Sequence, residues 1–176
     1  QGDWSSDVCS SDLKGKSGLI DSTGSIVIPF TYDDLSYFSP ESLVAMRKKN
    51  KWGYINLENK TIIPAKYDFA NNYSDGLAVV RIAKYWGAID ATGNLIIPAK
   101  WEFLSSFKNG VAFVKSEGKC GLMSRSSTLL LDCLYDKYQW ETDKVIRFDR
   151  DGHYGYYNIL KKEWIWKEDE IGRAHV

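Results

Sequence analysis

One glycine recurs along this chain at nearly constant spacing. The steps between successive copies are 35, 34, 34 and 34 residues, and the copies are Gly18, Gly53, Gly87, Gly121 and Gly155. A fixed period of this length is typical of tandem structural repeats, each of which is too small to bury its own apolar face. The sequence therefore predicts about 4.5 repeats over residues 14–169, with a core that forms between neighbouring units.

A shared motif surrounds these glycines. In three copies an aromatic residue precedes the glycine, and in three a proline follows it after eleven residues. The structural positions of the repeat are Trp52, Gly53, Pro64, Trp86, Gly87, Pro98, Gly121 and Gly155. An aromatic–acid pair then recurs as Tyr32-Asp33, Tyr67-Asp68, Trp101-Glu102 and Tyr135-Asp136. Because the aromatic residues keep the repeat period, we expect them in the core, with Trp86 more deeply buried than Trp164.

Short runs rich in β-branched and aromatic residues predict strands, as in LAVVRI at 77–82, WGYIN at 52–56 and TIIP at 61–64. Glycine or asparagine between two such runs supplies the positive φ of a tight hairpin turn. Proline is expected to end the third strand, because it cannot donate a ladder hydrogen bond. The glycine inside the second strand indicates a bulge, or a close backbone approach from the next unit.

The fold class that follows is all-β. Each repeat of about 34 residues is expected to form a β-meander of about three antiparallel strands, followed by a ten-residue loop to the next repeat. The repeats are expected to form an open array, with a β-propeller as the alternative. Since propeller blades commonly carry four strands, three-stranded units favour the open array.

The repeat resembles the WG-repeat family, a bacterial β-repeat named for its Trp-Gly pair. The segments that carry the resemblance are KWGYINLENKTIIPAKYDFANNYSDGLAVV at 51–80 and YWGAIDATGNLIIPAKWEFLSSFKNGVAFV at 85–114. The first copy lacks the tryptophan, and the fourth and fifth copies lack the proline and the turn glycine. The resemblance implies a tandem array from a longer bacterial protein, and it brings no common set of catalytic residues.

The two ends interrupt the repeat pattern and are related to each other. DVCSSDL at 7–13 can be encoded by GAC GTG TGC TCT TCC GAT CTC, whose reverse complement encodes EIGRAHV, residues 170–176. Both termini therefore resemble translated sequencing-adapter sequence. We expect residues 1–13 and 170–176 to be non-native tails that are dispensable for stability, and residues 14–169 to be a fragment of a longer chain.

Composition and motifs argue against nucleic-acid binding, a membrane helix, a metal site and catalysis. Basic and acidic residues number 23 each without a single-sign stripe, so no nucleic-acid partner is expected. No apolar run approaches the length of a membrane helix. The histidine and cysteines of the repeat region form no zinc pattern, and Asp149-Arg150-Asp151-Gly152 lacks the later acids of a calcium loop. With no phosphate loop or nucleophile elbow, we expect no catalytic, cofactor or metal residues and no enzyme.

The recurring polar residues have structural explanations. Once-per-repeat acids such as Asp68 suit turns or backbone hydrogen bonds better than a catalytic pair, which needs two differently tuned carboxyls at one place. Asp21, Asn56 and Asp90 open hairpin turns, where their side chains bond to the backbone. Cys120 and Cys133 replace a Trp and an Ala of the repeat, which indicates small buried groups, and a disulfide between them stays open.

The function that fits these features is a non-catalytic scaffold that binds another protein of unknown identity. Rigid repeats present variable loops, and binding residues favour loops on a rigid scaffold. The most variable segments are 69–75, 82–85, 103–109, 116–119 and 150–153. The alternative is a carbohydrate- or cell-wall-binding module that uses Trp140, Trp164 and Trp166. Uncapped apolar ends, including Trp164, Ile165 and Trp166, also predict self-association. The sequence assigns no cellular location.

Overall fold

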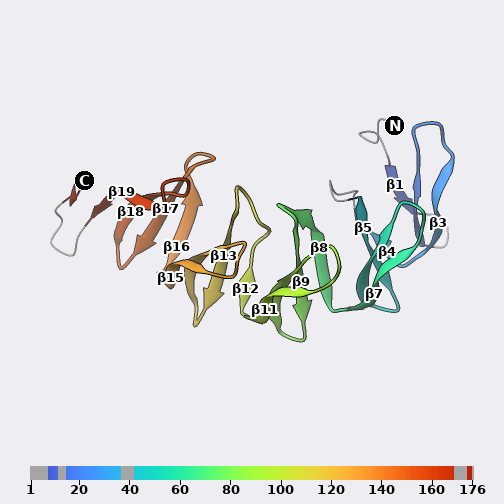
Figure 1. The fold of residues 1–176 in the computed structure, drawn as a ribbon, viewed down its shortest axis with the longest axis horizontal. Coiled ribbons are helices and arrows are strands. Elements are labelled where there is room, and N and C mark those ends of the chain that lie inside the picture. The colour runs from blue at the N-terminus through green and yellow to red at the C-terminus, as the bar shows by residue number, and fades with distance from the viewer. Residues whose placement is uncertain (1–7, 12–14, 37–41, 169–173, 176) are drawn as a thin grey trace. The chain divides into compact units, whose positions relative to one another are not determined.

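The computed structural model describes residues 8–11, 15–36, 42–168 and 174–175, and all regular structure in these ranges is β (Figure 1). This part of the chain contains no helix long and apolar enough to cross a membrane. The strands are β1 (Val8–Ser11), β2 (Ser17–Ile20), β3 (Ile26–Tyr32), β4 (Asp34–Leu35), β5 (Leu43–Lys48), β6 (Lys51–Asn56), β7 (Thr61–Tyr67), β8 (Phe69–Ser74), β9 (Leu77–Ile82), β10 (Tyr85–Ile89), β11 (Leu95–Trp101), β12 (Phe103–Leu104), β13 (Val111–Ser116), β14 (Lys119–Ser124), β15 (Leu129–Tyr135), β16 (Lys137–Trp140), β17 (Val145–Arg150), β18 (His153–Asn158), β19 (Glu163–Glu168) and β20 (Ala174–His175).

These strands form five small antiparallel sheets in two compact units, Gln1–Ala99 and Lys100–Val176. The first unit holds the sheets β1-β2-β3, β4-β5-β6-β7 and β8-β9-β10-β11, the last of which runs past the boundary to Trp101. The second unit holds β12-β13-β14-β15 and β16-β17-β18-β19-β20. In the described ranges no sheet closes into a barrel. The all-β prediction and the repeats of about 34 residues are confirmed, and the separate sheets are consistent with an open array.

The sheets that follow β1-β2-β3 have four strands, or five in the last, rather than the three expected from the sequence. β4, β8, β12 and β16 follow the aromatic–acid pair and occupy part of the segment that was expected to be a loop. Within 69–75, the strand β8 buries Ala70 and Tyr73 and pairs with β9 around a bulge between them. The expectation that 69–75 is a contact loop is therefore wrong. Four-stranded sheets also match the strand count of a propeller blade, so the count does not argue for the open array.

The repeating glycine sits opposite a wide bulge in the edge strand of its own sheet. Trp52 pairs with Tyr67 and Tyr54 pairs with Ile63, which leaves three residues of β7 opposite Gly53. A Cβ built on Gly53 would lie 2.5 Å from the Ile63 carbonyl oxygen. The predicted bulge is confirmed, and the close approach comes from the same repeat rather than from the next one.

The same bulge explains the prolines, which do not end the third strand as expected. Pro64 lies inside β7 and Pro98 inside β11, and both strands are the outer edge of their sheets. A proline is tolerated there because an edge strand, and a bulge in particular, leaves some N–H groups without a ladder partner. Pro29 has the same place within β3.

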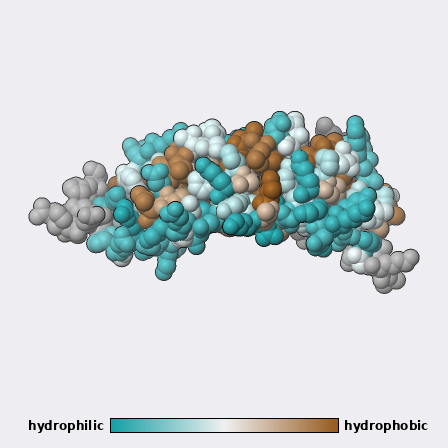
Figure 2. Space-filling model, turned by 90° about the horizontal axis from the view of Figure 1, so that it is seen from below, coloured by the Kyte–Doolittle hydropathy of each residue, from teal (hydrophilic) through white to brown (hydrophobic). Residues whose placement is uncertain are grey.

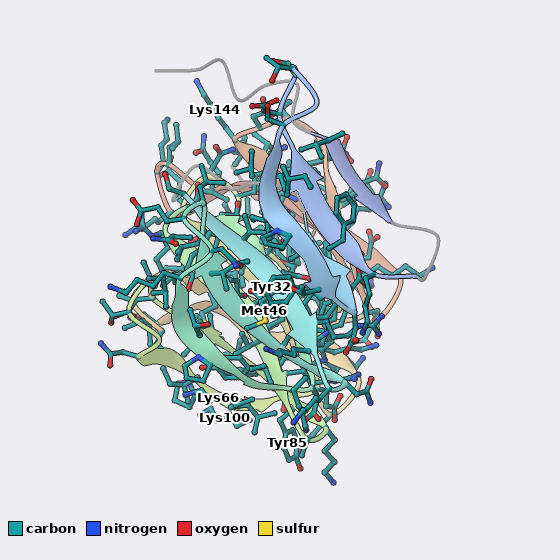
Figure 3. All side chains as sticks on the ribbon, turned by 90° about the vertical axis from the view of Figure 1, so that its right-hand side faces the viewer. Tyr32, Met46, Lys66, Tyr85, Lys100 and Lys144 are labelled. Carbon is teal, nitrogen blue, oxygen red and sulfur yellow. The ribbon has the colours of Figure 1, made fainter. Side chains whose placement is uncertain are left out.

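The core lies between successive sheets within each unit. Tyr32, Met46 and Ile55 belong to a cluster between the first and second sheets, and Figure 3 shows Tyr32 and Met46 in the interior. Tyr54 and Val80 belong to the cluster between the second and third sheets. The second sheet thus buries its two faces against different neighbours, as expected for units that cannot bury their own surface.

Two tail segments pair with the repeats. Val8–Ser11 forms β1 against β2, with Ser10 opposite Gly18 in the same way that Met46 lies opposite Gly53. Ala174–His175 pairs with the end of β19. The expectation that residues 1–13 and 170–176 are non-native tails stays a prediction, because backbone pairing requires no particular side chains. The rest of 1–13 and of 170–176 lies outside the described residues.

The last sheet differs from the expected uncapped end. Trp164 packs inward against Tyr135, Phe148 and Tyr157 instead of facing outward. The opposite face of this sheet carries the Arg147–Asp149 ion pair, with 2.8 Å between Nε and Oδ1. Tyr154, Tyr156 and Trp166 lie on the same face beside this ion pair. The face is therefore both charged and aromatic, and self-association through it stays a prediction.

Tryptophan burial also differs from the sequence-based ranking. Trp86 is half-buried, as Trp164 is, and it contacts the exposed ring of Phe69 at 5.5 Å between centroids. The tryptophan that precedes the repeating glycine is therefore less buried than its regular spacing predicts. The core positions are Tyr54, Tyr67 and Tyr73, each almost completely buried.

The turn after the second strand has the predicted side-chain cap. In the third sheet, Asp90 Oδ1 accepts hydrogen bonds from the Thr92 and Asn94 amides at 2.9 Å and from the Thr92 hydroxyl at 2.7 Å. The Thr92 hydroxyl, followed by the Asn94 amide, the Asn94 side chain and the Thr92 amide, lowers the pKa of Asp90 from 3.8 to about 2. Asp21 caps the equivalent turn of the first sheet.

These caps predict how acid affects stability. Because the pKa of Asp90 is lower in the folded chain, its contribution is present above the unfolded pKa of 3.8 and is lost as the pH falls towards about 2. In Asp90→Asn, which keeps an acceptor oxygen, we expect a shallower loss of stability between about pH 4 and pH 2. Urea unfolding at several pH values measures it. An unchanged slope would mean that these hydrogen bonds do not favour the charged form.

Candidate functional site: a ridge of hairpin turns

The recurring acid joins the tips of successive β-hairpins. In the first unit, Asp68 accepts a hydrogen bond from Lys51 Nζ through Oδ1 and one of 2.7 Å from the Ala83 amide through Oδ2. Lys51 ends the hairpin tip 48–51, and Ala83 lies in the next tip, 82–85. One carboxylate therefore holds two tips together. We call the surface formed by residues 48–51 and 82–85 the turn ridge.

The second unit repeats this arrangement. Asp136 accepts from Lys119 Nζ at 2.5 Å and from the Asp151 amide at 2.9 Å, which connects the tips 116–119 and 150–153. Glu102 accepts from the amides of Glu117 and Gly118 at 3.1 Å each. The prediction that the recurring acids bond to the backbone of turns is confirmed for these residues.

The ion pairs and backbone bonds favour the charged form of these acids. The Lys51 ammonium, followed by the Ala83 amide, holds the pKa of Asp68 below its usual range. Lys119 and the Asp151 amide act in the same way on the pKa of Asp136. At neutral pH both carboxylates are ionised and occupied by partners of the same chain, so their arrangement is that of a clamp rather than of an acid–base pair.

The backbone of the turn ridge is tightly defined. Lys49 and Asn50 have φ values of 51° and 61°, and Ala83 has a φ of 54°. Positive φ values at the central residues are typical of the two-residue turns that match the twist of a hairpin. The ridge thus presents its side chains from fixed backbone positions, although neither tip contains glycine.

The tip 82–85 is chemically unlike the others. Ile82 and Tyr85 lie directly opposite each other at the end of β9 and β10, and they are 42% and 38% exposed. The equivalent pairs in the other tips are Lys48–Lys51, Ser116–Lys119 and Arg150–His153. Figure 3 shows Tyr85 at the margin of the molecule, and Figure 2 shows hydrophobic residues interrupting a largely hydrophilic surface. This tip carries apolar side chains where its counterparts carry polar ones.

A row of aromatic side chains, the aromatic row, lies directly beneath the turn ridge. Trp52 and Trp86 contact the ring of Phe69 at 6.0 Å and 5.5 Å between centroids. The Arg47 guanidinium lies 5.8 Å from the ring centre of Trp52, and that of Arg81 lies 5.7 Å from that of Trp86. Such cation–π contacts hold the arginines on the tryptophan faces. Trp52 and Trp86, expected in the core, instead lie half-buried beside the hairpin tips.

The other predicted contact segments are less exposed or more polar than the tip 82–85. In 103–109, Leu104 and Phe107 are buried, so this segment contributes to the core as well as to the surface. The tips 116–119 and 150–153 are turns, as expected, and each carries an acid, Glu117 and Asp151.

The three tryptophans of the carbohydrate alternative are occupied by contacts within the chain. Trp140 packs edge-on against Phe113, and Lys108 Nζ lies 4.9 Å from its ring centre. Trp164 packs against the core cluster of the second unit. Trp166 contacts Tyr154 at 5.0 Å between centroids. Since a sugar needs an open ring face, this arrangement favours Trp166 over the other two as a sugar contact.

The remaining candidate groups form no further site among the described residues. Cys120 is buried and Cys133 half-buried, both are free thiols, and burial raises the pKa of each. Among the described residues no group of His, Cys, Asp and Glu side chains could hold a metal ion. Sequence reasoning selected 82–85 as a variable turn but missed its chemistry. The available signal was Ile82 and Tyr85 at positions where the other repeats have polar residues.

Comparisons with known proteins agree with this architecture. The chain resembles solved structures described as a eukaryotic initiation factor (TM-score 0.60, 10% identity) and Kluyveromyces lactis Hsv2 (TM-score 0.53, 10% identity). It also resembles dihydro-heme d1 dehydrogenase NirN in complex with DHE (TM-score 0.52, 12% identity). The alignments cover 90%, 86% and 92% of this chain but only 50%, 57% and 43% of those chains. At such identities the likeness concerns the fold alone.

The repeats themselves match a known family. No curated protein matched the sequence. The family model described as WG containing repeat matches residues 18–52, 52–85 and 86–120, which together are more than half of the chain. The fourth and fifth repeats, which lack the proline, lie almost entirely beyond the matched residues and still form antiparallel sheets. The chain therefore belongs to the WG-repeat family.

Proposed function

We propose that this chain is a non-catalytic scaffold that binds another protein through the turn ridge of the Gln1–Ala99 unit. The observation that carries the proposal is the exposed Ile82–Tyr85 pair on a tip whose backbone is fixed by Asp68. Binding sites gather on loops held by a rigid scaffold, and an exposed aromatic residue is a common anchor. A catalytic role has no comparable support, because the ionised acids of the ridge are already bonded to its lysine and backbone.

The proposal can be tested by selecting ligands and then removing the tip. Peptides from a random display library would be selected on the intact chain and counter-selected on Ile82→Ser/Tyr85→Ser, which removes both apolar side chains without adding charge to the ridge. We expect most enriched peptides to bind the double variant at least tenfold more weakly, which is about 1.4 kcal/mol. Fluorescence anisotropy of single peptides would measure this loss.

The matched control is Arg150→Ser/His153→Ser, which changes the equivalent cross-strand pair of tip 150–153 in the second unit. The control variant should keep full binding, and urea unfolding should show that both variants remain folded. Peptides that bind both double variants equally well would contradict the proposal. Glycan binding that is lost in Trp166→Ala would replace it by the carbohydrate alternative.

A further inference from the structure

We infer that the turn ridge recognises an acidic segment of its partner, in which Asp or Glu residues flank a large apolar side chain. This inference rests on the proposed function and adds the chemistry of the partner. It follows from the charges on the ridge, from the partners those charges already have, and from the apolar pair beside them.

The ridge carries three lysines that no carboxylate neutralises in the part of the chain that the structure describes. Lys48, Lys49 and Lys84 are exposed, and none has an acid partner among the described residues. Lys84 Nζ instead lies 5.1 Å from the ring centre of Tyr85. Exposed, unpaired ammonium groups create a positive potential that is felt over about one Debye length, roughly 8 Å at physiological salt.

The carboxylates near the ridge are already paired. Asp68 is bonded to Lys51, and Asp33 to Lys16 at 2.6 Å between Nζ and Oδ1. Asp34 lies 3.5 Å from the Arg47 guanidinium. The formal net charge of the whole chain is zero, but this surface carries a local excess of positive charge.

The matched surface of the second unit lacks this excess. Its tips contain Glu117 and Asp151, and Arg150 Nε lies 3.2 Å from Asp151 Oδ2. The two units therefore share the clamp but differ in the side chains that they expose beside it. In the first unit, the described residues combine unpaired lysines with exposed apolar side chains, and in the second they do not. The second unit provides an internal control for the inference.

The apolar pair decides which anionic ligand fits best. Ile82 and Tyr85 offer two adjacent apolar surfaces at the end of one hairpin, and Lys84 lies in the turn between them. An apolar side chain can be buried against the pair while flanking carboxylates face the lysines. Charge complementarity of this kind mainly accelerates association and selects among partners.

The test uses a dye-labelled 12-residue peptide with an aromatic centre flanked by Asp and Glu, and fluorescence anisotropy on the full chain. We expect binding that weakens at least tenfold in Lys48→Glu/Lys49→Glu/Lys84→Glu, and also at 0.5 M salt. The same peptide with Asn and Gln in place of its acids should bind at least fivefold more weakly. The control Arg125→Glu/Lys137→Glu/Lys144→Glu makes the same charge change on exposed residues of the second unit and should bind normally.

The contrasting outcomes separate this inference from the proposed function. If selected peptides depend on Ile82 and Tyr85 but show no acidic bias and no response to the charge reversal, the inference is wrong and the proposed function stands. Equal weakening by both triple variants would mean that only the total charge matters, and would overturn it. Competition by a single-stranded oligonucleotide of equal charge, stronger than by the peptide itself, would also overturn it in favour of a nucleic-acid ligand.

Discussion

Replacing Gly87 with valine is expected to destabilise the fold by about 3 kcal/mol, the upper part of the range for overpacking. A Cβ at this position would lie 2.5 Å from the Ile97 carbonyl oxygen and 2.9 Å from the Ala99 amide nitrogen. Both groups are backbone of the bulged edge strand, so no side chain can rotate away. Urea unfolding followed by tryptophan fluorescence would measure the change.

The control for this substitution is Gly118→Asn. Gly118 has a φ of 76°, a Cβ at this position would meet no atom within 4 Å, and asparagine tolerates this region of φ better than most residues. We expect a loss of no more than about 1 kcal/mol there. If Gly87→Val cost no more than Gly118→Asn, the close approach of the edge strand would not be the reason that glycine recurs.

Replacing Tyr54 with alanine is expected to cost about 3–5 kcal/mol, as for other large buried side chains. Tyr54 is completely buried and its ring contacts Tyr73 at 5.0 Å between centroids. Its hydroxyl donates a 2.7 Å hydrogen bond to the Asn71 carbonyl oxygen in β8. The side chain therefore connects the sheet β4-β5-β6-β7 with the sheet that follows it in the same unit.

Two further variants divide this loss into its parts. Tyr54→Phe removes only the hydroxyl and should cost about 1 kcal/mol, the usual contribution of a hydrogen bond. Tyr85→Ala removes an exposed tyrosine of the same unit and should change stability by about 0.5 kcal/mol or less. Similar losses for Tyr54→Ala and Tyr85→Ala in urea unfolding would show that the two sheets do not share a core.

The repeat and its hydrogen-bonding residues could be read from the sequence because each has a local cause. The glycine must recur wherever the edge strand bulges towards it, and the acid must recur wherever two hairpin tips are joined. Asp68 and Asp136 were expected to bond to turns, and they do. Asp21 and Asp90 were expected to cap hairpins, and they do.

The features that the sequence did not predict depend on packing between elements. Phe69–Ser74 resembles a loop because it contains two asparagines, yet Ala70 and Tyr73 fill the space between sheets and make it a strand. Pro64 is compatible with a strand only because β7 is an edge strand with a bulge. Trp86 shares the period of the core residues but lies half-buried near the hairpin tips, against Phe69 and Arg81 of its own sheet.

The repeat uses different residues for the connection between its hairpin tips and for its exposed surface. This explains how a binding surface could vary while the backbone arrangement stays the same. The clamp uses an acid, the lysine that closes one tip and a backbone amide of the next tip, and it does not involve the side chains at the other positions of the tips. Tips 48–51 and 82–85 therefore keep the same connection through Asp68 while one carries lysines and the other isoleucine and tyrosine. Only the residues that face solvent need to change for a new partner.

The most direct test of the central claim is a titration of the isotopically labelled chain with a selected peptide, followed by amide chemical shifts. We predict that the largest shifts cluster in residues 47–52 and 81–86, on the turn ridge and the aromatic row below it. The equivalent tips 116–119 and 150–153 should stay within the background. Shifts of equal size at those tips, or a cluster around Trp166 with none at Ile82 and Tyr85, would contradict the claim that the turn ridge is the binding surface.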